Sequence, residues 1–342
     1  MPPSTPCIIP VFLPHRGCMH RCVFCNQHAI TGLSAGTVTP VVVQKTIAAH
    51  LERRRWPGRE VQVAFYGGSF TALAWSEQEV LLDAVSPFLA AKTVAAIRLS
   101  TRPDCLDAPL LEKLAGKGVR IIELGVQSMD DRVLSRCRRG HDAAASEGAV
   151  NLLKERGFTT GVQLLIGLPG ECRAGMMAGV RRLVRLRPDF VRIYPAVVVA
   201  GSPMAEDYRA GIFRPLSLAM AVLQVAWMKR VFTAAGIPVV RMGLQDCESL
   251  NGSILAGPHH PAFGEMVAGR LVFREARRLL RSQAGRACSL LVSARDTSVF
   301  LGHRRDNHRR LRQLGLLDRT EIVFDPLLER GTMRVVQGEG EG

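Results

Sequence analysis

The chain has 342 residues, of which 47% are apolar and 22% are charged, and its formal net charge is +15. This length suits one large core or a core with a small appended domain, and the composition is that of a folded protein. No run of eighteen apolar residues is present, which excludes a membrane-spanning helix, and no secretory signal begins the chain. We therefore expect a cytoplasmic protein without a membrane partner.

The first element is a short apolar strand at residues 8–13, which leads into a loop over residues 14–36. This loop holds Cys18, Cys22 and Cys25, with three and then two residues between them. Thiols this close do not form a disulfide framework, but one loop can wrap them around a single soft-metal centre. A 4Fe-4S cluster held by three cysteines keeps one iron open, as a reacting cofactor requires.

A structural zinc site is the alternative for the same loop. Zinc would need a fourth ligand, for which Cys7, His20 and His28 are candidates. No second pair of closely spaced cysteines follows, although paired cysteines are typical of closed zinc sites. The other cysteines are scattered and are expected to be buried free thiols.

Strands and helices alternate over the next part of the chain. Thr39 before Pro40 predicts the start of a helix to residue 54, Ser76 with Glu79 predicts a capping box for a helix to residue 91, and Asp142 predicts the start of a helix to residue 156. Further strands are predicted at residues 61–66, 95–100, 119–125, 160–166 and 190–194. Six such strands predict a parallel α/β sheet, and periodicity alone leaves open whether it is flat or barrel-like.

Several segments resemble one known family when taken in chain order. The cysteine spacing, with aromatic Phe24 directly before Cys25, resembles the radical S-adenosylmethionine (SAM) superfamily. Within it, the chain resembles the radical SAM domain of the Elongator catalytic-subunit family and, more distantly, the coproporphyrinogen dehydrogenase branch. The segments that carry this resemblance are residues 14–18, 65–71, 101–104, 123–128, 139–141 and 192–195.

The resemblance implies a partial (β/α)6 barrel that binds a 4Fe-4S cluster and SAM. In that superfamily the cluster passes one electron to SAM, which yields methionine and a 5'-deoxyadenosyl radical. An electron donor of the flavodoxin or ferredoxin type is implied as a partner. The resemblance also places Phe24 among the cofactor contacts.

The resemblance implies further cofactor contacts at the strand ends. Gly67, Gly68 and Ser69 correspond to a glycine-rich segment whose backbone receives the methionyl amino group. Gln127 and Arg139 correspond to contacts with the SAM ribose and carboxylate. Gln163 and Ile166 correspond to contacts with the ribose and the adenine.

Two departures from the Elongator family matter. This chain has Ser100 where that family usually has a glutamate, which puts one SAM-facing carboxylate in doubt. Only about 80 residues follow Pro261, so we expect no acetyltransferase domain and do not carry over acetyl transfer to a wobble uridine.

Beyond the sixth strand, a helix is predicted at residues 216–235 and a strand at 239–242. The following loop contains His259, His260 and Glu265, which suit metal binding or acid-base work. The alternative is a proline-bounded loop whose histidines form local hydrogen bonds.

The last part of the chain is strongly basic. Residues 270–319 hold thirteen arginines against four acidic residues. Arg304, Arg305, Arg309 and Arg310 are candidate contacts to tRNA or another structured RNA, because each phosphate they neutralise releases counterions. We predict three parts: a radical SAM core at 1–240, a small α+β region at 241–336, and a disordered tail at 337–342.

Three functions are compatible with these features. The first is a radical SAM enzyme that modifies an RNA such as tRNA. The second is a radical SAM enzyme that acts on a small molecule or a protein, with the arginines serving only as surface. The third is a zinc-dependent RNA-binding module without catalysis.

Overall fold

The computed structural model describes residues 6–32, 38–53, 58–283 and 286–337. The chain forms two compact units, one of residues 1–217 with 231–259 and one of residues 218–230 with 260–342. Two predicted features, the end of the cysteine loop at residues 33–36 and the tail beyond residue 337, lie outside the described residues.

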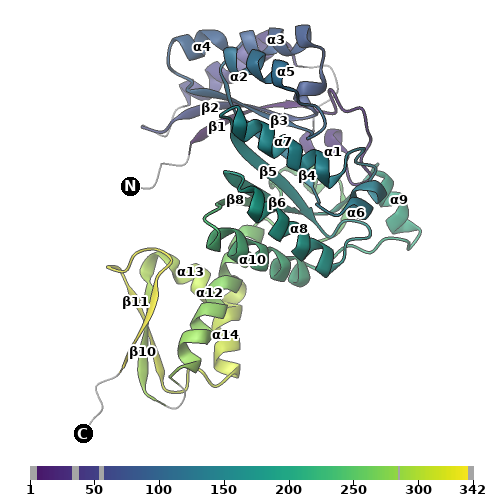
Figure 1. The fold of residues 1–342 in the computed structure, drawn as a ribbon. Helices are drawn as coiled ribbons and strands as arrows, with labels where there is room; N and C mark the ends of the chain where they lie inside the picture. The colour runs from purple at the N-terminus through teal and green to yellow at the C-terminus, as the bar shows by residue number, and fades with distance from the viewer. Residues whose placement is uncertain (1–5, 33–37, 54–57, 284–285, 338–342) are drawn as a thin grey trace. The chain divides into compact units, whose positions relative to one another are not determined.

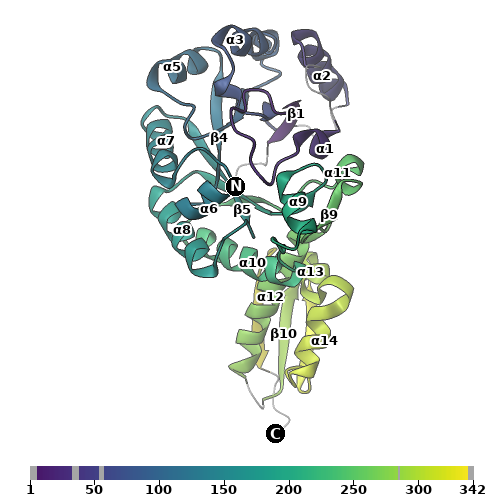
Figure 2. The same cartoon turned by 90° about the vertical axis from the view of Figure 1, so that its right-hand side faces the viewer.

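The first unit is built on a parallel sheet of seven strands in the order β1-β2-β3-β4-β5-β6-β8, which curls in Figure 2. The strands are β1 (Cys7–Leu13), β2 (Val61–Gly67), β3 (Ala96–Thr101), β4 (Val119–Gln127), β5 (Thr159–Ile166), β6 (Phe190–Pro195) and β8 (Val239–Met242). All neighbouring pairs are parallel, as expected where helices connect the strands. The predicted α/β class and partial barrel are confirmed, with β8 as a seventh strand.

Helices connect these strands and lie along the outer side of the curled sheet (Figure 2). They are α2 (Pro40–Glu52), α3 (Trp75–Asp83), α4 (Ser86–Ala90), α5 (Ala108–Gly116), α6 (Asp131–Arg136), α7 (Ala143–Glu155) and α8 (Arg173–Leu186). The side chains of Thr39 and Asp142 cap α2 and α7 as predicted. The capping box at Ser76 is wrong, because Ser76 lies inside α3 and the cap residue is Ala74. The single helix expected to residue 91 is two helices, and Pro87 lies in the first turn of the second.

Short elements complete the first unit. These are α1 (Gln27–Thr31), α9 (Pro203–Arg209), α11 (Glu248–Asn251) and an antiparallel pair of strands, β7 (Val198–Val199) and β9 (Ile254–Ala256). Because the long sheet is parallel, the cysteine loop after β1 and the segments after β2 and β4 leave it at the same edge. That edge is where barrel-like α/β proteins place their active sites.

The second unit has a three-stranded sheet with helices against it (Figure 1). Its elements are α12 (Phe263–Arg281), β10 (Cys288–Ser293), α13 (Thr297–Leu301), α14 (Asp306–Gln313), β11 (Thr320–Asp325) and β12 (Met333–Gln337), with α10 (Leu218–Ala234) contributing its residues up to Arg230. Phe273 of α12, Leu290 of β10, Phe300 of α13 and Leu311 of α14 are buried in its core. The sequence predicts a small α+β region at 241–336; the observed unit also includes residues 218–230 and leaves 241–259 in the first unit. Within the described residues, no helix has both the length and the hydropathy to cross a bilayer.

Candidate active site at the strand ends

The three cysteines of the loop after β1 lie close together. Cys22 is buried, whereas Cys18 and Cys25 are half-buried. The Sγ atom of Cys18 lies 3.8 Å from Oγ of Ser69, and the amide of Cys25 donates to the carbonyl of Cys22. The loop thus presents three thiols together with the segment that follows β2.

Burial governs the ionisation of these thiols. Burial raises the pKa of Cys25 to about 12, with the neighbouring Cys22 and Cys18 adding to the shift. Burial also raises the pKa of Cys18, and its contact with Ser69 opposes that shift. Iron binds the thiolate form, so loading this site releases protons.

His15 and Gln27 hold the two ends of the cysteine loop together. Nε2 of His15 accepts a hydrogen bond from the amide of Gln27 at 2.9 Å, and the Gln27 side chain binds the His15 amide in return. The Gln27 side chain also donates to the carbonyl of Gly67 at 2.7 Å. Burial, then His28 and Arg21, lower the pKa of His15, which favours the neutral ring that this acceptor role requires.

The glycines after β2 pack directly against the cysteine loop. A Cβ atom on Gly68 would lie 1.8 Å from the carbonyl oxygen of Arg16, and one on Gly17 would lie 2.2 Å from that of Ser69. The amide of Gly68 donates to Leu13, and that of Ser69 donates to Arg16. In this structure the glycine-rich segment therefore positions the cysteine loop, and its backbone amides are already paired.

Arg139 reaches the cysteine loop from the segment after α6. Its Nη1 lies 3.0 Å from Sγ of Cys22, and its Nη2 donates to the carbonyl of Gly125. The guanidinium is buried, and its Nε has no hydrogen-bond partner in the described part of the chain. A buried cation with a free donor beside three thiols suits an anionic group at this place.

Gln127 ends β4 in an unusual backbone conformation. Its φ is +67°, in the left-handed region that residues other than glycine seldom adopt. The pairing of β4 with β5 shifts register between Leu124 and Gln127. The Gln127 side chain lines a pocket, so the irregular end of β4 lies at the wall of that pocket.

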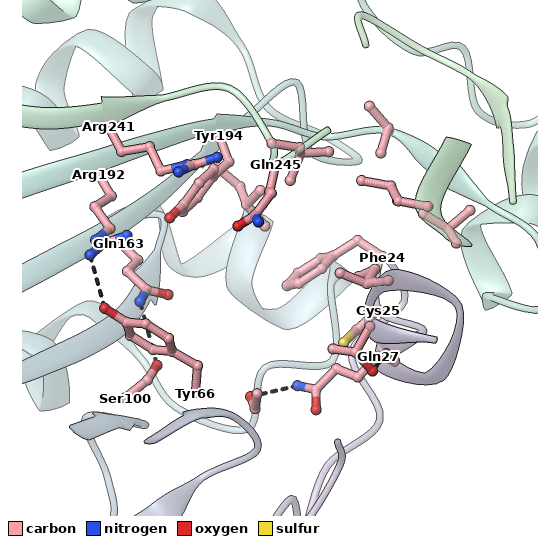
Figure 3. Close-up of a pocket in the computed structure, with 18 of the residues that line it drawn as sticks. Phe24, Cys25, Gln27, Tyr66, Ser100, Gln163, Arg192, Tyr194, Arg241 and Gln245 are labelled. Carbon is pink, nitrogen blue, oxygen red and sulfur yellow. Dashed lines mark hydrogen bonds between the residues drawn. The ribbon is translucent and has the colours of Figure 1, made fainter. Parts of the chain in front are cut away.

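A pocket of about 510 Å³ lies inside the curled sheet, within the first unit, and reaches the cysteine loop. This volume is in the range of sites that bind small molecules and cofactors. Its lining includes Phe24, Cys25, Gly67, Gln127 and Gln163, all of them predicted cofactor or cluster residues. Figure 3 shows Phe24, Cys25 and Gln27 on one side of it.

The other side of the pocket carries Tyr66, Gln163 and Arg192 (Figure 3). All three contact the carboxylate of Glu123, a side chain that is 0% exposed. Arg98 and Arg192 contact its carboxylate at 2.9 and 2.8 Å. The Tyr66 hydroxyl donates to it at 2.8 Å, and Gln163 donates at 3.1 Å. Burial raises the pKa of Tyr66, and Glu123 raises it further, so the hydroxyl stays protonated as this donor role requires.

The remaining predicted residues are placed as follows. Ser100 lines the pocket, and Gln163 donates to its hydroxyl at 3.4 Å. Ile166 is fully buried and is not among the residues that line the pocket. The other predicted residues, Cys18, Cys22, Gly68, Ser69 and Arg139, do not line it either. Cys18 contacts Ser69, Arg139 contacts Cys22, and Gly68 packs against Arg16 of the cysteine loop.

Sequence reasoning gave no role to Glu123, Arg192 or Arg241, and it missed His15 and Gln27. A signal for the first three was present. Each is a charged residue within an otherwise apolar strand, and such a residue needs a buried partner or a ligand. His15 and Gln27 gave no comparable signal.

The histidine loop forms local hydrogen bonds. Nε2 of His259 lies 2.8 Å from Oδ1 of Asn251, and Nδ1 of His260 accepts from the amide of Ala262 at 3.0 Å. Glu265 lies exposed in the first turn of α12. Over the described residues, no three His, Cys, Asp or Glu side chains group around one metal ion. A 4Fe-4S cluster does not need three ligands around one metal ion, because each cysteine thiolate binds a different iron of the cluster.

The second unit carries an arginine cluster, formed by Arg270, Arg274, Arg277 and Arg310 on α12 and α14. The guanidinium groups of Arg270 and Arg310 lie 5.4 and 5.0 Å from the centre of the Phe273 ring. Burial lowers the pKa of Arg270, and the charges of Arg310, Arg277 and Arg274 lower it further. Like charges this close favour an anionic ligand.

Of the four predicted RNA contacts, only Arg310 belongs to the arginine cluster. Arg309 pairs with Asp306 on the same helix. Arg304 and Arg305 are exposed and have φ values of +51° and +60° in the turn before α14.

Two family profiles match the chain. The Radical SAM superfamily matches residues 12–178, and the radical SAM C-terminal domain matches residues 188–272. The cofactors of this superfamily are a 4Fe-4S cluster and SAM. The site fits them, because three thiols for iron adjoin the free donor of Arg139 and a pocket of ligand size. This assignment counts against the non-catalytic zinc module.

Similar proteins include an uncharacterized protein of Methanocaldococcus jannaschii, which is 32% identical over 58% of this chain and 64% of its own length. The tRNA uridine(34) acetyltransferase of Methanocaldococcus infernus is 24% identical over 66% of this chain and 49% of its own length. The chain therefore spans less than two thirds of either relative.

Among solved structures, the archaeal Elp3 of Methanocaldococcus infernus aligns with a TM-score of 0.63 at 21% identity, over 80% of this chain and 64% of that one. This likeness concerns the fold. The two family profiles, which match residues 12–178 and 188–272, show that the chain belongs to the radical SAM superfamily of enzymes.

Proposed function

We propose that this radical SAM enzyme modifies an RNA substrate, with tRNA as the first candidate. The observation that carries the proposal is the arginine cluster. Arg270, Arg277 and Arg310 have no carboxylate within ion-pair distance among the described residues, and Arg270 and Arg310 stack on the same buried ring. A compact set of unpaired guanidinium groups suits the phosphates of a nucleic acid. The similarity to a tRNA uridine(34) acetyltransferase supports the same substrate class.

Within the first unit, we assign the cluster to Cys18, Cys22 and Cys25. When bound and reduced, the cluster supplies the electron that cleaves SAM to methionine and a 5'-deoxyadenosyl radical. Gln127, at its strained strand end, and Gln163 lie in the pocket where they can orient the nucleoside part of SAM.

Two further contacts belong to this assignment. Phe24 and Gly67 line the pocket together with Cys25, where they would contact bound SAM. Gly68, Ser69 and Arg139 act on the cysteines themselves, through the packing and contacts described above. Ile166 supports the pocket wall from the core.

An electron donor and a cellular compartment complete the proposal. The cluster needs an electron donor, for which a flavodoxin or ferredoxin suits the one-electron chemistry. A reducing cytoplasm is the compartment in which nine free cysteines and an oxygen-sensitive cluster persist.

The test is anaerobic reconstitution with iron and sulfide, reduction with dithionite, and chromatography for 5'-deoxyadenosine after SAM is added, with and without bulk tRNA. We expect product in both cases and more of it with tRNA. The variant with Arg270→Gln and Arg310→Gln should keep basal SAM cleavage, lose the stimulation by tRNA, and bind tRNA with a flatter dependence on salt.

The matched control is the variant with Arg304→Gln and Arg305→Gln, which removes two exposed charges from the same unit outside the arginine cluster. Equal loss in both variants would show that net charge alone attracts RNA. Unchanged tRNA affinity after loss of Arg270 and Arg310 would refute the RNA assignment. Cys18→Ala, Cys22→Ala and Cys25→Ala should each abolish the cluster, whereas Cys172→Ala, at an exposed cysteine, should not.

A small-molecule or protein substrate is the second candidate. The pocket favours it, because its walls are mostly apolar and, among the described residues that line it, two arginines are the only basic ones. Product formation that tRNA does not change would support this candidate.

A further inference from the structure

The pocket has an unbalanced positive charge at the side away from the cysteines. Arg192 and Arg241 are among the described residues that line it, and no Asp, Glu or Lys is. Below them, Arg98 and Arg192 share the single carboxylate of Glu123. Two guanidinium groups therefore share one carboxylate, and Arg241, which lies opposite Arg192 where β6 pairs with β8, adds a further positive charge.

Arg192 is fixed within this network. Its Nε lies 2.8 Å from Oε2 of Glu123, and its Nη2 donates to the Tyr66 hydroxyl at 2.9 Å. Its side chain is only 11% exposed. Glu123 carries one negative charge and already pairs with both Arg98 and Arg192, so it does not neutralise the charge of Arg241 as well.

Arg241 is held differently. It lies in β8, opposite Arg192 of β6, and within the described residues its side chain makes one hydrogen bond, a long one of 3.4 Å from Nε to the carbonyl of Gly243. None of the described carboxylates lies within ion-pair distance of it. Its guanidinium lies beside Tyr194 and near Gln245 at the pocket (Figure 3). A half-buried guanidinium with one long hydrogen bond, beside Tyr194 and near the amide of Gln245, suits an anion as its partner.

We propose that Arg241, with Tyr194 and Gln245, binds an anionic group of the substrate, either a phosphate or a carboxylate. Guanidinium groups pair with both in a two-pronged geometry. SAM must approach the thiols, and Figure 3 shows Cys25 on the opposite side of the pocket from Arg241. The anion therefore belongs to the second molecule in the site. This inference rests on the proposed radical SAM function, and it specifies the chemistry of the group to be modified.

The test measures binding to the reconstituted holoenzyme with SAM present, by isothermal titration calorimetry. The probes are inorganic phosphate, uridine 5'-monophosphate and succinate, and uridine serves as the uncharged counterpart. We expect at least one anion to bind and uridine to bind about tenfold more weakly than its monophosphate if the group is a phosphate. Tighter binding of succinate than of the two phosphate probes would identify the anionic group of the substrate as a carboxylate.

Arg241→Gln should weaken binding of the preferred anion about tenfold or more, and Arg241→Lys should restore part of it. The control is Arg209→Gln, which removes an exposed arginine of α9 in the same unit and should change nothing. Binding of none of the three anions, or equal loss in the Arg209 variant, would overturn the proposal.

SAM itself carries a carboxylate, so the affinities of SAM and 5'-methylthioadenosine, which lacks that carboxylate, are measured for each variant. We expect Arg241→Gln to leave both unchanged. Loss of SAM affinity alone would assign Arg241 to SAM and overturn the proposal. These readouts need neither RNA nor turnover, so failure of tRNA stimulation and failure of anion binding are separate results.

Discussion

The guanidinium Nη1 of Arg139 lies 3.0 Å from Sγ of Cys22, although 117 positions separate the two residues in the chain. This contact joins the cysteine loop after β1 to the segment after α6. It places a fixed positive charge against one of the three sulfurs assigned to the cluster, where it stabilises the more negative, reduced state.

Arg139→Gln should therefore lower the reduction potential of the reconstituted cluster. If the lost charged hydrogen bond favours the reduced state by about 1.4 kcal/mol, the shift is about 60 mV for one electron. Spectroscopic redox titration measures it. Arg136→Gln, at an exposed position nearby, serves as the control, and an equal shift there would show that the contact with Cys22 has no special role.

Gly68→Ala should disrupt the cysteine loop. The added Cβ would lie 1.8 Å from the carbonyl oxygen of Arg16, so the loop backbone must move. We expect a loss of about 3 kcal/mol in unfolding free energy, and reduced iron content after reconstitution. Gly148→Ala is the matched control, because a Cβ there meets nothing within 4 Å in the middle of α7, and it should stabilise by about 0.5 to 1 kcal/mol. Full iron content in the Gly68 variant would contradict the packing argument.

Glu123→Gln should strongly destabilise the first unit. It removes the only carboxylate between Arg98 and Arg192 and leaves two buried cations unpaired. The expected loss is about 3 to 5 kcal/mol, measured by urea unfolding. Glu112→Gln breaks an exposed pair with Arg156 and should cost less than about 1 kcal/mol. Similar losses of unfolding free energy in both variants would show that the buried network around Glu123 stabilises the fold no more than an exposed ion pair does.

Glu171 makes stability depend on pH. Burial raises its pKa to about 7, although it accepts hydrogen bonds from the amides of Gly167 and Leu168. Between its unfolded pKa of about 4.5 and this value, the unfolded chain releases a proton that the native chain keeps, so stability falls as the pH rises. A pKa shift of this size lowers the free energy of unfolding by about 3 kcal/mol, and the full loss is reached above about pH 7. Urea unfolding from pH 5 to 8 should show this fall, and Glu171→Gln should remove it. A flat profile in the unchanged protein would contradict it.

The sequence predicted the frame of the first unit well, because its strands are short apolar segments bounded by turn residues. The cysteine loop, Gly67 and Gln127 could be placed together from the parallel topology alone, since each follows a strand of one sheet. The Ser76 prediction failed because a capping sequence also occurs inside helices, where tertiary packing sets the boundary.

Other parts of the site depend on contacts between distant segments. Nothing in the sequence around Gly68 shows that its hydrogen atom faces the carbonyl of Arg16. The arginine cluster is equally hidden, because Arg310 meets Arg270 only after α12 and α14 pack around Phe273. Neighbouring arginines such as Arg304 and Arg305 look equivalent in the sequence, yet the described arginines that stack on that ring are Arg270 and Arg310.

Glu123 has a consequence for how this enzyme can diversify. The Glu123 carboxylate contacts Arg98 and Arg192 in the middle of the sheet, and it also positions Tyr66 and Gln163 at the pocket wall. A mutation of Glu123 that alters substrate preference should therefore also lower the stability of the fold. Leu244 and Gln245 follow β8 and line the pocket but do not contact Glu123. Substitutions there can change the substrate contacts with little loss of folding stability. Relatives with new substrates should accordingly differ first at these peripheral positions and keep the buried charges.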